Sequence, residues 1–125
     1  MSAFSGSFSE LRPYRIWEGA HAHAVTGRNV QFGLIDLEPN IDVPEHSHPN
    51  EQLGFILQGK LRFTIGGETR ELGPGDTYCI PADMPHQAST GPDGCVAVDI
   101  FSPPRSDWEA LPRVDPRMAA WPPPV

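Results

Sequence analysis

Apolar residues alternate with polar ones in short runs, and glycine or proline interrupts nearly every run. Val30, Phe32 and Leu34 form one such series, and a second spans residues 61–65. Residues two apart on a β-strand lie on the same face, so each run predicts a strand with one buried face. The 12 glycines and 15 prolines place turn signals at short intervals. Many short strands separated by such turns predict a β-sandwich or barrel.

The predicted strands follow these runs, and almost no helical periodicity appears. Gly66-Gly67 joins two runs and predicts a tight hairpin. One helical turn is expected at residues 107–111. The expected strands are Val30–Leu37, Ile41–His46, Leu53–Gln58, Lys60–Ile65, Glu68–Leu72, Thr77–Ile80, His86–Ser89 and Cys95–Phe101.

Size and charge exclude several classes of protein. A chain of 125 residues forms one domain. The net charge of −7, with no basic stripe, argues against nucleic-acid binding. No run approaches the roughly 20 apolar residues of a membrane span, and the first ten residues lack a secretory pattern. We expect a cytoplasmic protein with neither a nucleic-acid nor a membrane partner, in which Cys79 and Cys95 are free, buried thiols.

The two ends differ from the middle of the chain. Residues 1–28 carry scattered aromatic side chains and are expected to form an arm that packs on the chain's own barrel or on a partner's. Residues 29–105 form the main domain, and residues 106–125 form a proline-rich tail. Proline lacks the backbone donor that a sheet needs, so strands should stop near Phe101. Trp108 and Trp121 are expected to anchor the tail on the surface.

Three histidines in two short blocks indicate one metal site. His46 and His48 have i, i+2 spacing, which places both side chains on one face of a strand. His86 follows a Gly-Asp turn and a further strand, and it can close on the same point. Imidazole suits zinc, copper, iron and nickel, so the set predicts a bound metal. His21 and His23 form a second pair without a convincing third ligand, and we expect them at the surface or under the arm.

Two neighbouring residues are candidates for a fourth ligand. Strand alternation distinguishes Gln52 from Glu51 only weakly, because Pro49 and Asn50 can bend the segment. A neutral glutamine would leave a divalent ion with its full charge and strengthen it as a Lewis acid. Four protein ligands would still leave coordination positions open for a substrate.

Asp99 is the candidate general acid or base. It interrupts an apolar strand and shares one face with Ala97 and Phe101. If that face lines the barrel, desolvation raises the pKa of the carboxyl toward a useful range; otherwise the side chain faces water. Arg105 would clamp a substrate carboxylate with its planar fork or form a surface salt bridge. Phe101 would pack against a ring of the substrate or fill the barrel.

The two histidine blocks resemble the two motifs of the cupin superfamily. In the first motif Asn40 stands at the opening glycine position, His46 and His48 match, and Gly59 closes the motif. Gln52 falls at the position of the fourth ligand.

The second motif is matched by Gly75, Pro81 and His86. Asp83 replaces its internal glycine and Thr90 replaces its asparagine. Asp and Asn tolerate turn conformations well, so the departures at Asp83 and Asn40 are mild.

The resemblance covers about residues 30–101 and implies an all-β fold, the double-stranded β-helix or cupin jelly-roll barrel. It further implies a homodimer. It implies one divalent ion, manganese, iron, nickel or zinc, in the mouth of the barrel. The implied metal ligands are His46, His48, Gln52 and His86.

The end of the last strand carries a closer resemblance. The spacing of Asp99, Phe101 and Arg105 is similar to that in the small KdgF-type cupins of pectin and alginate breakdown. Those cupins linearise 4,5-unsaturated uronates to 5-keto-4-deoxyuronate. The resemblance implies a sugar-acid substrate and catalytic roles for these three residues. The alternatives are an iron-dependent dioxygenase of the cupin type and a non-catalytic module that binds a sugar acid or a metal.

Overall fold

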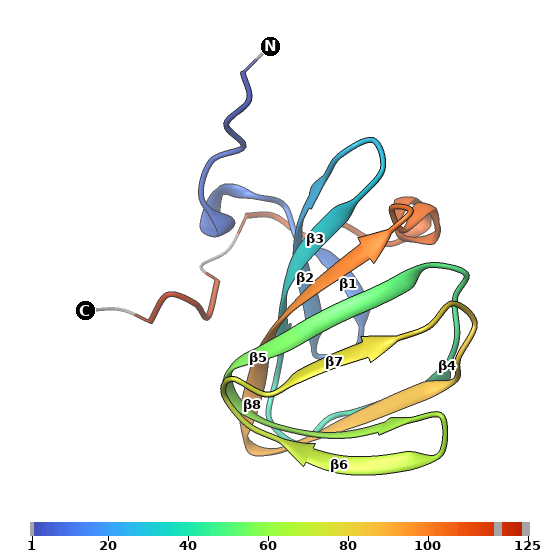
Figure 1. Ribbon diagram of the computed structural model, residues 1–125. Helices are drawn as coiled ribbons and strands as arrows, with labels where there is room; N and C mark the ends of the chain where they lie inside the picture. The colour runs from blue at the N-terminus through green and yellow to red at the C-terminus, as the bar shows by residue number, and fades with distance from the viewer. Residues whose placement is uncertain (1, 117–118, 124–125) are drawn as a thin grey trace.

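The computed structural model describes residues 2–116 and 119–123, and almost every ordered element is a β-strand (Figure 1). The expected turn at residues 107–111 is a short 3-10 helix, η2, that begins one residue earlier. The elements are η1 (Phe8–Glu10), β1 (Tyr14–Trp17), β2 (Ala20–Thr26), β3 (Gln31–Leu37), β4 (Asp42–His46), β5 (Glu51–Ile65), β6 (Glu68–Leu72), β7 (Thr77–Ile80), β8 (His86–Ser102) and η2 (Ser106–Ala110).

The strands form one antiparallel eight-stranded sheet that curls on itself. Its order is β1-β2-β3-β8-β5-β6, with β4 paired to β8 and β7 paired to β5. The first half of β8 pairs with β4 and the end of β5, whereas its second half pairs with β3 and the start of β5. These two long strands therefore run through both walls of the curled sheet (Figure 1). The predicted all-β jelly-roll fold is confirmed.

The structure differs from the predicted strands in two respects. Residues 14–26, expected within an arm, form β1 and β2 and extend the sheet beside β3. The expected breaks after residues 58 and 89 are absent, because β5 and β8 each continue as one strand. Around Gly59, which has a φ of 78°, the pairing of β5 with β8 shifts register twice. The glycine thus marks a bulge within a strand and not its end.

The barrel interior holds two apolar clusters. One centres on Ile56, Phe63 and Ile80. The other centres on Phe101 and Trp108. A third, smaller cluster joins Leu34, Val96 and Ala119, which brings the tail against the sheet.

Both ends of the described chain pack on the chain's own sheet. The ring of Phe8 meets Phe32 and Trp121, each at 6.3 Å between ring centroids. His23 is fully buried, and its Nδ1 lies 3.0 Å from the carbonyl oxygen of Phe8. His21 is buried as well, so neither histidine lies at the surface, and His23 packs under the N-terminal segment.

Part of the predicted tail, residues 117–118 and 124–125, lies outside the described residues. The division into residues 1–28, 29–105 and 106–125 stays a prediction, as does the homodimer.

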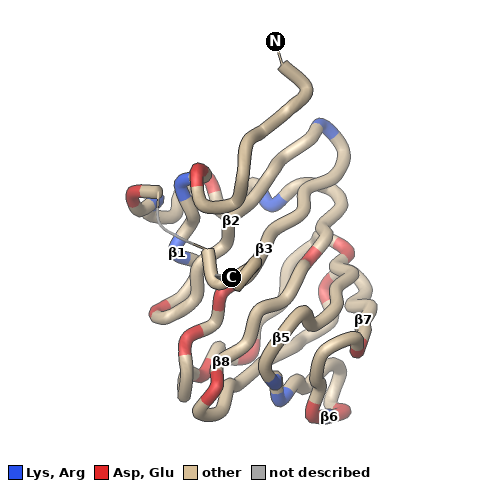
Figure 2. Tube along the Cα trace, turned by 90° about the vertical axis from the view of Figure 1, so that its left-hand side faces the viewer, with Lys and Arg blue, Asp and Glu red and all other residues tan. Residues whose placement is uncertain are grey.

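Acidic side chains are spread over many elements of the chain, in keeping with a net charge of −7 (Figure 2). Within the described residues, no helix has the length and apolar character to cross a membrane.

Both cysteines are free, as predicted, but only Cys95 is buried. The expectation that Cys79 is buried is wrong. Side chains alternate along β7, and because Ile80 is fully buried, Cys79 faces outward.

Candidate metal centre and cavity

Three histidine side chains converge at one end of the barrel. His46 ends β4, His86 begins β8, and the two residues are direct partners across these strands. His48 follows two residues after His46. The ligating nitrogens of all three lie within 4.8 Å of one another, the one such group of His, Cys, Asp or Glu in the described chain. The sequence analysis assigned these three histidines to one site, and in the fold their side chains lie together.

Each of these rings is tied to the backbone through Nδ1. The Nδ1 of His46 lies 2.8 Å from the Pro44 carbonyl oxygen. The Nδ1 of His48 lies 3.0 Å from the carbonyl oxygen of Asn50. The Nδ1 of His86 lies 2.9 Å from the carbonyl oxygen of Met84. A proton on Nδ1 satisfies each contact and leaves Nε2 with its lone pair. This is the arrangement that orients imidazole ligands toward a metal.

The two buried histidines favour the neutral form that a metal requires. Burial lowers the pKa of His86 to about 4. Burial and the positive charge of Arg105 also lower the pKa of His48.

Gln52 faces this cluster, whereas Glu51 faces away. The Gln52 side chain is buried, and its Oε1 lies 3.0 Å from Nε2 of His48. Glu51 is exposed, because the two neighbours alternate along β5. The residues present therefore fit a divalent metal ion held by imidazole nitrogens and one amide oxygen, without a thiolate or carboxylate. The ligand roles stay predictions.

Asp99 lies at one end of an inward-facing row that runs across three strands. Gly54 of β5 pairs with Asp99 of β8 on one side and with Tyr78 of β7 on the other. Because Gly54 has no side chain, the Tyr78 hydroxyl reaches across it and donates a 2.5 Å hydrogen bond to Oδ1 of Asp99. A Cβ atom at position 54 would overlap both partners.

The environment of Asp99 makes its carboxyl easier to protonate. Burial raises its pKa to about 6, although hydrogen bonds from Tyr78 and Gln52 and the charge of Arg105 act in the opposite direction. Burial and the neighbouring Asp99 charge raise the pKa of Tyr78 well above its usual value, so the phenol stays a hydrogen-bond donor. The alternation of β8 thus places Asp99 on the face that lines the barrel.

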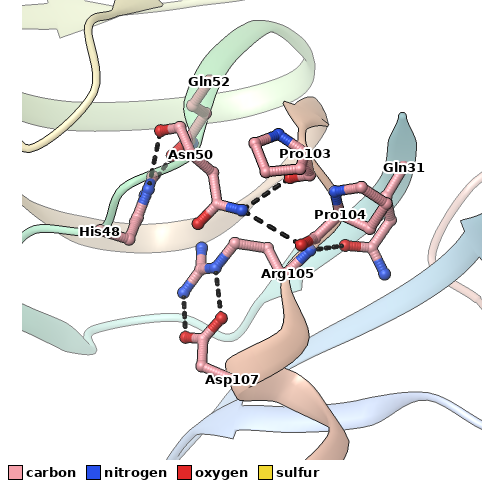
Figure 3. A network of polar contacts seen from close by, with 8 residues as sticks. All are labelled: Gln31, His48, Asn50, Gln52, Pro103, Pro104, Arg105 and Asp107. Atoms are coloured by element: carbon pink, nitrogen blue, oxygen red, sulfur yellow. Dashed lines mark hydrogen bonds and ion pairs between the residues drawn. The ribbon is translucent and has the colours of Figure 1, made fainter. Parts of the chain in front are cut away.

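The Arg105 side chain is fixed in position by its neighbours, among them Asp107 (Figure 3). Its Nε and Nη2 donate hydrogen bonds of 2.9 and 2.8 Å to the carboxylate of Asp107. The guanidinium also lies 5.0 Å from the Phe101 ring centroid and 4.9 Å from that of Trp108. Its side chain is only 10% exposed. The Phe101 ring, in turn, is buried and fills the barrel beside His48.

Asn50 connects the histidine loop to the segment that carries Arg105 (Figure 3). Its side-chain amide donates hydrogen bonds to the carbonyls of Pro103 and Pro104, at 2.6 and 3.2 Å. The backbone carbonyl oxygen of Asn50 is the partner of His48 Nδ1. The Arg105 amide donates at 2.9 Å to Gln31 from β3. Loop, tail and sheet therefore fix the relative positions of His48 and Arg105.

One cavity of about 270 Å³ joins these groups. Its polar lining includes His46, His86, Gln52, Asp99 and Arg105. The volume lies just below the roughly 300–1,000 Å³ that is usual for ligand sites. The cavity therefore suits a small molecule.

The sequence prediction missed Tyr78 and Asn50. Both depend on pairings between distant segments, and neither residue type carries a local signal for such a role. The pattern of β7 alone could have placed Tyr78 on the inner face opposite Cys79, but not against Asp99.

Comparisons with known proteins agree with this geometry. The family model described as "Cupin domain" matches residues 33–101. The dimethylsulfoniopropionate lyase DddQ of Ruegeria pomeroyi is 37% identical over 80 residues, which cover 63% of this chain and 38% of that protein. The pectin degradation protein KdgF of Dickeya dadantii is 31% identical over 68 residues, which cover 54% of this chain and 62% of that protein.

This chain thus spans less than two thirds of the length of either relative. Among solved structures, KdgF from Halomonas sp. superimposes with a TM-score of 0.71 at 26% identity, covering 82% of this chain and 98% of that one.

Proposed function

This chain belongs to the cupin domain family, and we propose that it is a metal-dependent isomerase of small carboxylate-bearing substrates. The specific reaction that we propose is the linearisation of 4,5-unsaturated uronates to 5-keto-4-deoxyuronate. One observation carries the proposal: His46 and His86 of the histidine cluster, the buried Asp99 and the Arg105 side chain border a single cavity. The likeness to two KdgF proteins, one of them named for pectin degradation, supports the choice of substrate.

The residues divide the chemistry between them. His46, His48, His86 and Gln52 would hold the metal, which supplies a Lewis acid for developing negative charge on oxygen. Arg105 binds the substrate carboxylate with the guanidinium edge that Asp107 leaves free. The ring opens as the bond between the anomeric carbon and the ring oxygen breaks; the anomeric hydroxyl gives up its proton and the ring oxygen gains one, so an aldehyde and an enol form. Asp99 then delivers a proton to carbon as the enol becomes a ketone, and it receives the proton that leaves the enol oxygen. Substrate and product are isomers, so the reaction needs no co-reactant.

An ultraviolet assay tests this proposal. Metal-loaded protein is mixed with unsaturated galacturonate, and the absorbance of the enol ether is followed against the spontaneous rate. We expect metal-dependent loss of absorbance by the wild-type protein. His48→Ala is expected to abolish it, and Asp99→Asn to lower kcat by roughly 10²–10⁴-fold, the usual range for general acid–base catalysis.

The controls separate reaction from binding. Arg70→Ala, which removes an exposed cationic side chain of β6 that is not among the residues lining the cavity, is expected to leave the rate unchanged. Full turnover by Asp99→Asn would remove Asp99 from the mechanism. No turnover with any of several divalent metals would overturn the uronate reaction. Oxygen uptake with iron(II) would then favour a dioxygenase, and ligand binding without product would favour a binding module.

A further inference from the structure

Much of the cavity lining is apolar and has no part in the proposed reaction. We refer to six of these apolar side chains as the apolar wall. They come from four elements, β1, β3, β4 and η2. The apolar wall consists of Ile16, Trp17, Ile35, Leu37, Val43 and Trp108.

An irregularity in β1 turns two consecutive residues toward the cavity. On a regular strand Ile16 and Trp17 would face opposite sides. Here the pairing of β1 with β2 shifts register between Arg15 and Trp17, and both Ile16 and Trp17 line the cavity. Trp17 remains 47% exposed, which places it at the mouth. A large aromatic side chain left half in water at a cavity mouth is suited to contact a ligand.

The polar groups on the cavity are largely engaged with one another. Tyr78 donates to Asp99. Arg105 is paired with Asp107. Gln52 and the histidines form the candidate metal centre. A hydroxyl group pressed against the apolar wall would lose water without gaining a hydrogen bond, which disfavours a heavily hydroxylated ligand there.

We propose that the cavity takes acids with two unlike ends: an anionic head at the metal centre and Arg105, and an apolar body, such as an aromatic ring, against the apolar wall. This inference rests on the proposed function for the position of the head, and it narrows the substrates of that same site. In an unsaturated uronate, only the C4–C5 edge is apolar and can contact the apolar wall. In an enolisable 2-keto acid with an aromatic side chain, the whole ring can contact it.

Calorimetric titration with phenylpyruvate and pyruvate tests the apolar wall. The two probes share one head, and only phenylpyruvate carries an apolar body, so the ratio of their dissociation constants isolates the contribution of the body. The titrations use the whole 125-residue chain with and without zinc. We expect phenylpyruvate to bind at least about tenfold more tightly than pyruvate, since a buried aromatic ring contributes favourable transfer free energy.

Two variants of the apolar wall and one matched control complete the design. Trp17→Ala removes the ring at the mouth, and Val43→Thr replaces a methyl group with a hydroxyl at nearly constant volume. Each is expected to lower the affinity ratio at least about threefold while pyruvate binding is unchanged. Trp121→Ala removes a tryptophan of similar exposure, 36%, that is not among the residues lining the cavity, and it is expected to leave the ratio unchanged.

The outcomes separate this inference from the proposed reaction. An affinity ratio near one in the wild-type protein, or a ratio that neither wall variant lowers, overturns the apolar wall as a binding surface even if uronates are turned over. A ratio that falls in both wall variants supports it even if uronates are not turned over. Circular dichroism of each variant verifies that the fold is retained.

Discussion

At the scale of single residues, the two cysteines should differ sharply in reactivity. Cys79 is exposed on β7, whereas Cys95 is 3% exposed within the barrel. Burial, reinforced by the nearby Asp99, raises the pKa of Cys95 to about 12. Only the thiolate reacts with iodoacetamide, so Cys95 should remain protonated and unmodified at pH 8. We expect one adduct per chain by mass spectrometry of the native protein.

Two controls assign that adduct. The Cys79→Ser variant should show none under native conditions, and the urea-unfolded wild-type protein should show two. A second adduct on the native wild-type chain would mean that the β8 wall opens often enough to expose Cys95.

Single residues also explain why the two motifs tolerate their departures from the family pattern. Asn40 and Asp83 stand where the pattern has glycine, and they have φ values of 58° and 65°. Asn and Asp adopt this left-handed conformation more readily than other non-glycine residues. The Asp83 amide also donates at 2.8 Å to the carbonyl of His48, which ties the second motif to the first. The sequence therefore predicted these turns correctly, but not the contact between them.

At the scale of elements, the central strands were predictable and the N-terminal ones were not. β3 carries alternating apolar residues, and β6 and β7 lie between the glycines and prolines that bound them in the sequence. In β2, the inward residues Ala20 and Ala22 are small, and His21 and His23 on the other face are buried as well, His23 against the carbonyl of Phe8. With small residues on one face and buried histidines on the other, the sequence of β2 has no row of large apolar side chains. The long β5 and β8 looked divided because a bulge glycine and a turn glycine have the same appearance in sequence.

The Tyr78–Gly54–Asp99 row yields a prediction about strand packing. Gly54→Ala should lower the melting temperature, because overpacking of a filled interior costs about 1–3 kcal/mol, and it should break the bond between Tyr78 and Asp99. Gly73→Ala is the control, since its added methyl group meets open space. Thermal unfolding and the uronate assay of both variants measure the effect. A Gly54→Ala protein as stable and active as wild type would show that Tyr78 and Asp99 can move aside for the added methyl group without cost.

At the scale of the whole molecule, the two ends of the chain hold each other. The Arg15 amide donates to the Pro112 carbonyl and the Val114 amide to that of Pro13, both at 3.0 Å. The Arg113 side chain lies over the Tyr14 ring at 4.5 Å. Tyr14 in turn packs on Trp108, which lines the cavity. The tail therefore supports the strand that brings Ile16 and Trp17 to the cavity, an arrangement that composition alone could not reveal.

Removal of residues 112–125 tests this support while sparing Trp108. The truncated protein loses the partners of β1, so its melting temperature should fall by more than about 5 °C, the shift expected for a loss near 1–2 kcal/mol in a domain of this size. Hydrogen exchange should show the Arg15 amide losing protection while amides of β5 and β8 keep theirs, because those strands bond to each other. Phe4→Ser, at a side chain 90% exposed near the other end, serves as the control and should change neither measurement. If truncation left the melting temperature and the exchange of β1 unchanged, the contacts between the ends would contribute nothing to the fold, and β1 would be held by β2 alone.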